Sequence, residues 1–264
     1  MIRRRRHLPI EGFTPRPHTP QQCPASGATA SAYRSVEDRR PVTVRTWTDP
    51  ALVAGVSPAR AQQRIDALAR LSDLPGITPV RAGGLVDSRR GRHLYLVTDD
   101  NGEVLDPSVV DPAHLLRAAA DIAAALHRFH AAGHLHLALC PQALTTTPSG
   151  RIHLSAHRAP GVHWIAEAAL EHQAPEVGQA SGGEPRSDVY ALASTVLAVL
   201  DEGADTSWTS DAALVTALER ATAPSVADRP SDLGMLADEL DDAARRAAWW
   251  EGREESVFSQ RIMA

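Results

Sequence analysis

The spacing of apolar residues changes along the chain, and this change restricts the fold more than any other feature. Over residues 31–47, apolar and polar side chains alternate as they do in strands with one buried face, and further strands are expected over residues 78–85 and 93–98. The polar run 37–40 divides the first of these segments as a hairpin turn. One helical pattern, over residues 58–71, interrupts the strands. The first hundred residues therefore predict a small sheet with one helix.

Helical spacing dominates the remainder of the chain. Apolar residues between 115 and 129 form a stripe along one face of a predicted helix, and Gly133 is the candidate C-cap at which this helix ends. Further elements are expected as helices over 189–200, 212–220 and 231–246, and as strands over 144–146 and 152–154. The 189–200 segment is apolar almost all round, as in a buried central helix. A β-rich lobe followed by a helical lobe predicts an α+β fold.

Both ends of the chain are predicted to be tails. Residues 1–24 combine four consecutive arginines with five prolines and show no apolar periodicity, which indicates a flexible basic segment. The first lobe is expected over residues 25–99 and the second over residues 100–247. Residues 248–264 are expected to form an exposed C-terminal tail.

Composition excludes several classes of function and location. A net charge of −5 gives no reason to expect a nucleic-acid partner. The longest apolar run, 189–200, is too short to span a bilayer, and no apolar stretch follows the N-terminal arginines as in a signal peptide. Cys23 and Cys140 lie far apart without metal-ligand spacing, so free thiols in a reducing cytoplasm are expected.

The chain contains no lysine, because all 27 of its basic residues are arginine. A step that needs a lysine amine therefore cannot occur in this protein. Histidine pairs such as His134 and His136 do not complete a set of ligands with metal spacing, so no metal site is predicted.

Five motifs, in their order and spacing, resemble those of bacterial (Hanks-type) Ser/Thr protein kinases. Residues 136–143 stand where the family has H-R-D-L-K-P-x-N, and residues 156–158 stand where it has D-F-G. Residues 174–176 match its A-P-E motif, 187–192 its central-helix signature, and 228–230 its arginine motif. The resemblance covers most of the chain and implies a bilobal, protein kinase-like fold.

The same resemblance implies that the catalytic side chains have been replaced. Ala138 stands at the catalytic base, and Ala143 and Ala156 stand at the two magnesium ligands. Arg45 stands at the lysine that pairs with the phosphates, and Arg64 at its glutamate partner. No catalytic residue, cofactor or metal is therefore predicted, and the chain is interpreted as a pseudokinase.

The nucleotide site implied by the resemblance is also altered. Gly27 is the one glycine kept in the segment 25–30, where the family uses three to bring backbone N–H groups close to the phosphates. The positions that would enclose the base are small or polar: Ala32, Thr43 and Thr145. Gly27, Arg45 and Thr98 are the remaining candidates for contact with a nucleotide.

Residues with architectural roles in the family are retained. The resemblance implies a buried ion pair between Glu176 and Arg229, and it implies that Asp188 accepts hydrogen bonds from the backbone around His136. His136 and His157, together with Leu68 and Leu85, fit the column of side chains that joins the lobes in the family.

Two functions of different classes follow. The first is a scaffold or allosteric protein-binding module in bacterial Ser/Thr kinase signalling, with an active kinase or a phosphothreonine-reading, forkhead-associated domain as partner. The alternative is a nucleotide- or anion-sensing domain that uses Arg45 and Gly27 without phosphate transfer. An unconventional enzyme in the same cleft is a third hypothesis.

Some expectations concern single residues. Arg45 and Arg64 would repel each other, so a helix rotated outward with both arginines in solvent is preferred over an anion-accepting cleft. Thr14 and Thr19, each followed by proline, are candidate phosphorylation sites, whereas Thr145 is expected to point inward from a strand.

Overall fold

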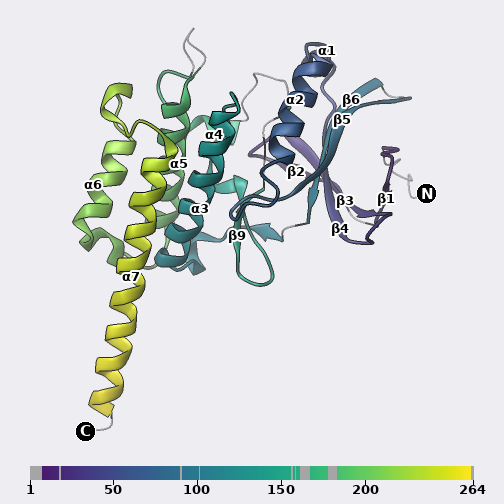
Figure 1. The fold of residues 1–264 in the computed structure, drawn as a ribbon. Coiled ribbons are helices and arrows are strands. Elements are labelled where there is room, and N and C mark those ends of the chain that lie inside the picture. The colour runs from purple at the N-terminus through teal and green to yellow at the C-terminus, as the bar shows by residue number, and fades with distance from the viewer. Residues whose placement is uncertain are drawn as a thin grey trace.

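A computed structural model describes residues 8–17, 19–89, 91–100, 102–155, 157, 159–160, 167–177 and 183–262, with side chains as far as residue 248. These residues form two lobes, one built on a sheet and one built mainly of helices (Figure 1). The predicted α+β, bilobal fold is confirmed.

The first lobe contains an antiparallel sheet. Its strands among the described residues are β1 (Phe13–Pro15), β2 (Gln21–Cys23), β3 (Ala28–Ser35), β4 (Pro41–Trp47), β5 (Val80–Ser88) and β6 (Gly91–Asp99). The hydrogen-bonded order is β1-β3-β4-β6-β5, and β2 also pairs with β3. Helices α1 (Pro50–Ala54) and α2 (Pro58–Ala69) follow β4, and α2 packs against β5.

Alternation along β4 decides which side chains reach the inside of the molecule. Val42 and Val44 point to the outer face of the sheet, where they pack with Tyr33 in a small separate cluster. Arg45 and Trp47 lie on the opposite face, and Trp47 belongs to the main core. The period of two therefore places Arg45 on the face that meets the second lobe.

The N-terminal tail predicted over residues 1–24 is wrong where β1 and β2 pair with β3. The Tyr33 hydroxyl also donates to the Leu8 carbonyl at 3.1 Å, and Ile10 is buried against the outer face of the sheet. Prolines did not prevent this pairing, because β1 is an edge strand whose outward N–H groups need no partner. Residues 1–7 and 18 lie outside the described part of the chain.

The second lobe is mainly helical. Its helices are α3 (Pro112–Ala131), α4 (Glu167–Leu170), α5 (Pro185–Glu202), α6 (Ala212–Ala221) and α7 (Leu233–Ile262). Its short 3-10 turns are η1 (Pro107–Val109), η2 (Pro141–Ala143), η3 (Ser207–Ser210) and η4 (Val226–Asp228). Strands β7 (Glu103–Val104), β8 (Leu144–Thr146) and β9 (Ile152–Leu154) form a second sheet. Helix α3 packs against α5 and α7 at the centre of the lobe.

Over the predicted C-terminal tail, residues 248–264, α7 continues as helix as far as Ile262. Figure 1 shows the last part of α7 extending beyond the rest of the lobe. The segment 248–262 contains no proline and a single glycine, Gly252, so nothing in it stops a helix that has already formed.

Three helices begin with the same short motif, an acceptor side chain followed by proline. Asp49, Ser57 and Asp111 are the N-caps of α1, α2 and α3, and each side chain accepts a hydrogen bond from a backbone N–H of the first turn. The following proline has a φ that suits the first helical position and lacks an N–H that would need a partner.

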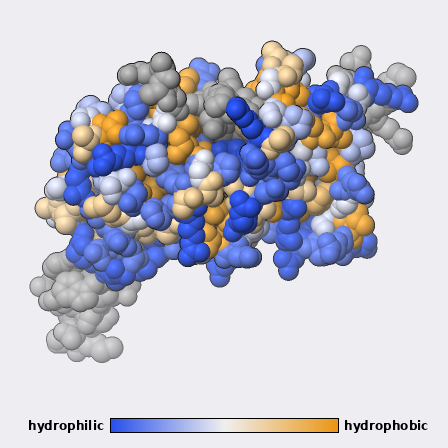
Figure 2. Space-filling model, turned by 45° about the horizontal axis from the view of Figure 1, so that its top comes forward, coloured by the Kyte–Doolittle hydropathy of each residue, from blue (hydrophilic) through white to orange (hydrophobic). Residues whose placement is uncertain are grey.

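One hydrophobic core runs through both lobes. It joins Leu68 and Leu96 of the first lobe to Leu126 and Leu192 of the second. On the face drawn in Figure 2 the surface is mostly polar, with apolar residues in scattered small groups. Within the described parts of the chain, no helix combines the length and hydrophobicity needed to cross a membrane.

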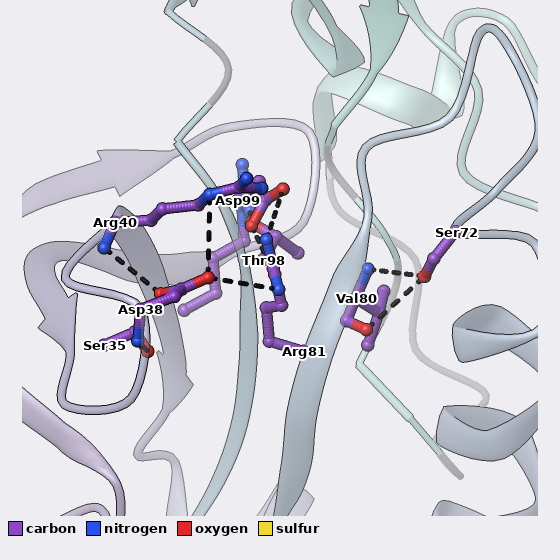
Figure 3. A network of polar contacts seen from close by, with 9 residues as sticks. Ser35, Asp38, Arg40, Ser72, Val80, Arg81, Thr98 and Asp99 are labelled. Atoms are coloured by element: carbon purple, nitrogen blue, oxygen red, sulfur yellow. Dashed lines mark hydrogen bonds and ion pairs between the residues drawn. The ribbon is translucent and has the colours of Figure 1, made fainter.

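Charged side chains fix the β3–β4 hairpin to the edge of the sheet (Figure 3). Arg81 on β5 pairs with Asp99 of β6 at 2.5 Å and with Asp38 of the hairpin turn at 3.5 Å. Arg40 pairs with the same Asp38 at 3.6 Å. This network is exposed to solvent and contributes little to stability by itself.

Candidate functional site between the lobes

Arg45 lies on β4 at the boundary between the lobes, and its side chain is buried. Its Nη1 donates to Oγ1 of Thr98 on β6 at 2.8 Å. Strand pairing sets Thr98 opposite Thr43, and Thr43 opposite Ala32, so three predicted nucleotide-contact positions lie side by side on this face.

Arg64 extends from α2 to the second lobe and is also buried. Its Nη1 donates to the Leu135 carbonyl at 2.7 Å, its Nη2 to the His136 carbonyl at 3.5 Å, and its guanidinium lies 5.1 Å from the centre of the Phe129 ring. The prediction that both arginines face solvent is wrong. Carbonyl oxygens and an aromatic ring can receive a guanidinium head while its stem packs in the interior, so α2 did not need to rotate outward.

The loop that follows α3 is held by Asp188 of α5. The carboxylate of Asp188, which is fully buried, accepts hydrogen bonds from the backbone N–H groups of His136 and Leu137 at 2.6 and 2.7 Å. His130 lies 2.8 Å from the same carboxylate. Leu137 has a φ of 53°, an unusual conformation for a residue with a Cβ, and these bonds maintain it. The predicted contact of Asp188 is present.

The positions expected to carry the base and one metal ligand are apolar and buried. Ala138 and Ala143 belong to the main hydrophobic core, as does Cys140 between them. Burial raises the pKa of the Cys140 thiol to about 11, so this thiol is protonated and weakly nucleophilic at neutral pH. Ala156, expected at the second metal ligand, lies outside the described residues.

His157 and His136 are fully buried, and their rings meet edge to face with Nδ1 of His157 3.4 Å from Nε2 of His136. Burial, with smaller effects of Arg45 and Arg64, lowers the pKa of His157 to about 3, so its ring is neutral at physiological pH. Leu68 is fully buried in the core and Leu85 is packed against it. Three of the four side chains predicted to join the lobes are therefore buried, and Leu85 is half-buried beside them.

The turn between β2 and β3 contains Gly27, whose φ of 64° suits glycine. This turn is folded inward, because Ala25 and Ala28 are fully buried in the main core. Nε1 of Trp47 donates to the Ser26 carbonyl at 2.8 Å. The indole of Trp47 thus occupies the inner face of the sheet beneath the turn, where a phosphate-binding loop would need open backbone N–H groups.

Glu176 and Arg229 form the ion pair predicted from the sequence. Nη1 and Nη2 of Arg229 donate to the two carboxylate oxygens of Glu176 at 2.8 and 3.0 Å. Ser187 adds a hydrogen bond to Glu176 at 2.6 Å. Burial of Glu176 opposes its ionisation, but the bonds from Arg229 and Ser187 outweigh it and hold its pKa at about 2.

These residues do not fit a magnesium–nucleotide complex. A magnesium ion is held by oxygen ligands, and Ala143 and Ala156 offer only methyl groups at the two positions expected to hold it. Among the described residues, His, Cys, Asp and Glu side chains nowhere form a group of three that could hold a metal ion. Two arginines face the boundary instead, and their charge repels a cation.

No family model matches the chain, and no curated protein matches it. A solved structure does. The kinase domain of PknI from Mycobacterium tuberculosis, in a doubly substituted form, aligns with a TM-score of 0.65 at 21% sequence identity. The alignment covers 89% of this chain and 96% of that domain. The chain has the bilobal fold of the protein kinases. At this identity the likeness describes the backbone architecture, and the chemistry of this chain must be argued from its own side chains.

Sequence reasoning missed three features of this protein kinase-like site: the burial of Arg45 and Arg64, the bond from Trp47 to the turn, and the contact of His130 with Asp188. A signal existed for the second, since Trp47 lies two residues after Arg45 and therefore shares its face of the strand. No sequence pattern indicated the other two.

Proposed function

We propose that this chain is a catalytically inactive pseudokinase that works as a protein-binding module, a scaffold or allosteric partner in bacterial Ser/Thr kinase signalling. The observation that carries the proposal is the contrast between two sets of residues. Glu176, Asp188 and Arg229 keep the contacts that hold the second lobe together. Ala138 and Ala143, at the positions that phosphate transfer requires, are buried methyl groups within the core.

The inward turn supports the same proposal. Phosphate transfer needs backbone N–H groups and charges arranged around a triphosphate and its metal ions. Here Ala25 and Ala28 are packed in the core, and the buried Trp47 indole is bonded to the Ser26 carbonyl of the turn. A fold that retains its two lobes without this arrangement is suited to presenting surfaces to other proteins.

The partners we propose are an active Ser/Thr kinase or a phosphothreonine-reading domain from the same host. The test is to titrate the full chain into each purified candidate and measure both complex formation and the rate of kinase autophosphorylation. We expect a saturable complex that forms equally well with and without ATP and magnesium. Failure to bind any kinase or phosphothreonine reader of the host, with no effect on their rates, would reject the proposed role.

A further inference from the structure

Thr14 lies at the middle of β1, a three-residue strand at the edge of the sheet, and its side chain is exposed. Its hydroxyl donates to the Arg34 carbonyl at 3.4 Å, which is long for an O–H donor, so this hydrogen bond is weak. Among the described strands β1 pairs only with β3, so few hydrogen bonds resist its separation from the sheet. Pro15 follows, and a residue before proline keeps an extended backbone when the strand is detached. The Thr14 hydroxyl is therefore accessible to an enzyme.

Arginine side chains flank this hydroxyl on one face of the sheet. Strand pairing places Arg34 of β3 directly opposite Thr14, at the separation of about 5 Å between Cβ atoms that such pairs have. Arg16, two residues after Thr14, lies on the same face by alternation, and its N–H continues the ladder to the Ala32 carbonyl at 2.9 Å. One N–H of Arg34 is bonded to the Arg39 carbonyl at 2.8 Å, and the guanidinium has further donors. Both arginine side chains are long enough to reach a group attached to Thr14.

Acidic side chains close to Thr14 in sequence or in the hairpin lie elsewhere. Glu11 lines a hollow with Phe13 on the outer face of the sheet. Burial, with a smaller effect of the Glu11 charge, raises the pKa of the Tyr95 hydroxyl on that same face. Asp38 of the hairpin turn already pairs with two arginines. Alternation places Thr14 on the opposite face from Phe13, so a negative group on Thr14 would meet arginines and not carboxylates.

We infer that Thr14 is phosphorylated by a separate, active kinase, and that Arg34 and Arg16 hold the phosphate and fix β1 to the sheet. Oγ1 of Thr14 attacks the γ-phosphorus of a nucleoside triphosphate, and its proton passes to the catalytic base of that kinase. The bond from the γ-phosphorus to the bridging oxygen breaks, and the nucleoside diphosphate leaves. The phosphate carries a charge of about −1.5 to −2 and three acceptor oxygens, which match the planar fork of a guanidinium.

Thr19 separates this site from an ordinary threonine before proline. It is also exposed and also precedes a proline, but it lies between β1 and β2, outside the register of either strand. A phosphate on Thr19 therefore has no arginine placed opposite it by strand pairing. The inference goes beyond the proposed protein-binding role, because it concerns a modification of this chain and needs no stable complex.

The role of the arginines is tested with the full chain prepared with phosphothreonine at position 14, followed by amide hydrogen exchange and mass spectrometry. We expect exchange over β1 to slow about fivefold or more, because charge-assisted hydrogen bonds oppose the release of the strand. Phosphothreonine at position 19 is the matched control and should leave exchange over β1 unchanged. Arg34→Met should remove most of the slowing, whereas Arg92→Met, which removes an exposed arginine of β6, should retain it.

The transfer itself is tested by incubating the full chain with each purified, active Ser/Thr kinase of the host, ATP and magnesium, and by mapping the modified residues by mass spectrometry. We expect phosphate on Thr14 with at least one kinase and none when the kinase is left out. Phosphate on other residues alone, or exchange over β1 that the phosphate does not slow, overturns the inference. A kinase that forms a complex with the chain and leaves Thr14 unmodified supports the proposed function and counts against this inference, so the two can fail separately.

Discussion

Arg229 forms more of the described contacts than any other residue discussed for the second lobe. Besides the two bonds to Glu176, it donates to the carbonyls of Ala223, Pro224 and Arg186, and it lies 4.9 Å from the centre of the Tyr190 ring. Its side chain has no exposed surface. Loss of the guanidinium would therefore strand several buried acceptors and a carboxylate at once.

We expect Arg229→Ala to lower the free energy of unfolding by about 3 to 5 kcal/mol, because it leaves the partner charge without compensation. Urea titration followed by circular dichroism measures the change. Arg245→Ala, which removes an exposed arginine of α7, is the matched control and should leave the free energy of unfolding almost unchanged. Similar costs for the two variants would contradict the role assigned to Arg229.

His157 links the stability of the protein to pH. Its pKa is about 3 in the folded protein and ordinarily 6.5, so below pH 6.5 the unfolded chain takes up a proton that the folded chain does not. Stability therefore falls as pH falls from about 6.5 toward 3.

Between pH 7 and pH 5 the wild type should lose about 2 kcal/mol through His157 alone, and His157→Phe should lose correspondingly less. The quantity to compare is the change in free energy of unfolding with pH in each protein, measured by urea titration, because the absolute stabilities also differ in packing. Parallel pH profiles for the two proteins would show that His157 takes up a proton in the folded protein as readily as in the unfolded chain, which would contradict the lowered pKa.

At the scale of elements, the segment that enters β5 joins the two lobes by its backbone. Leu154 of β9 donates to the Gly76 carbonyl at 2.8 Å, and Thr78 donates to the Leu154 carbonyl at 3.0 Å. Gly76 has a φ of 77°, and a Cβ added there would lie 2.8 Å from the backbone nitrogen of Ile122 in α3. Glycine thus allows this segment to approach α3 closely.

Gly76→Ala should destabilise the protein more than Gly133→Ala does. Gly133 has a φ of 79°, but a Cβ there would meet no atom within 4 Å. The Gly133→Ala variant therefore measures the cost of the backbone conformation alone, about 1 to 2 kcal/mol. The clash at Gly76 adds to that cost, since backbone atoms of a helix cannot move aside easily. Equal losses in urea titrations of the two variants would contradict the close approach.

The periodicity of apolar residues predicted most elements well. The helix expected over 58–71 is α2, and the strands expected over 144–146 and 152–154 have the bounds of β8 and β9. Local pattern and local turn chemistry determine these segments. The N-terminal segment was predicted wrongly, because pairing of β1 with β3 depends on a partner distant in sequence. The helical state of residues 248–262 was not predicted, because continuation of α7 depends on the helix before it.

The candidate site was less predictable than the fold. Alignment of the kinase motifs indicated which side chains stand at the positions of the site. The contacts of Asp188 and Arg229 could be predicted from that alignment. Whether Arg64 is buried depends on the carbonyls of Leu135 and His136, which a sequence does not place near α2. Solvation of a long side chain is decided by tertiary packing and not by residue type.

At the scale of the whole molecule, the two lobes share one hydrophobic core. We expect a single cooperative unfolding transition, with the calorimetric enthalpy equal to the van't Hoff enthalpy. Differential scanning calorimetry of the full chain measures both quantities. Two separate transitions, or a van't Hoff enthalpy well below the calorimetric one, would show that the lobes unfold independently.

The central claim is that a kinase-like architecture persists here without the side chains that position a metal-bound triphosphate. The most direct measurement is the transfer of γ-phosphate by the purified full chain, incubated with ATP and magnesium or manganese, to itself and to generic protein substrates. We expect no transfer above that of Arg45→Met prepared in the same way, a variant that controls for contaminating kinases. Transfer by the wild type that Arg45→Met abolishes would contradict it.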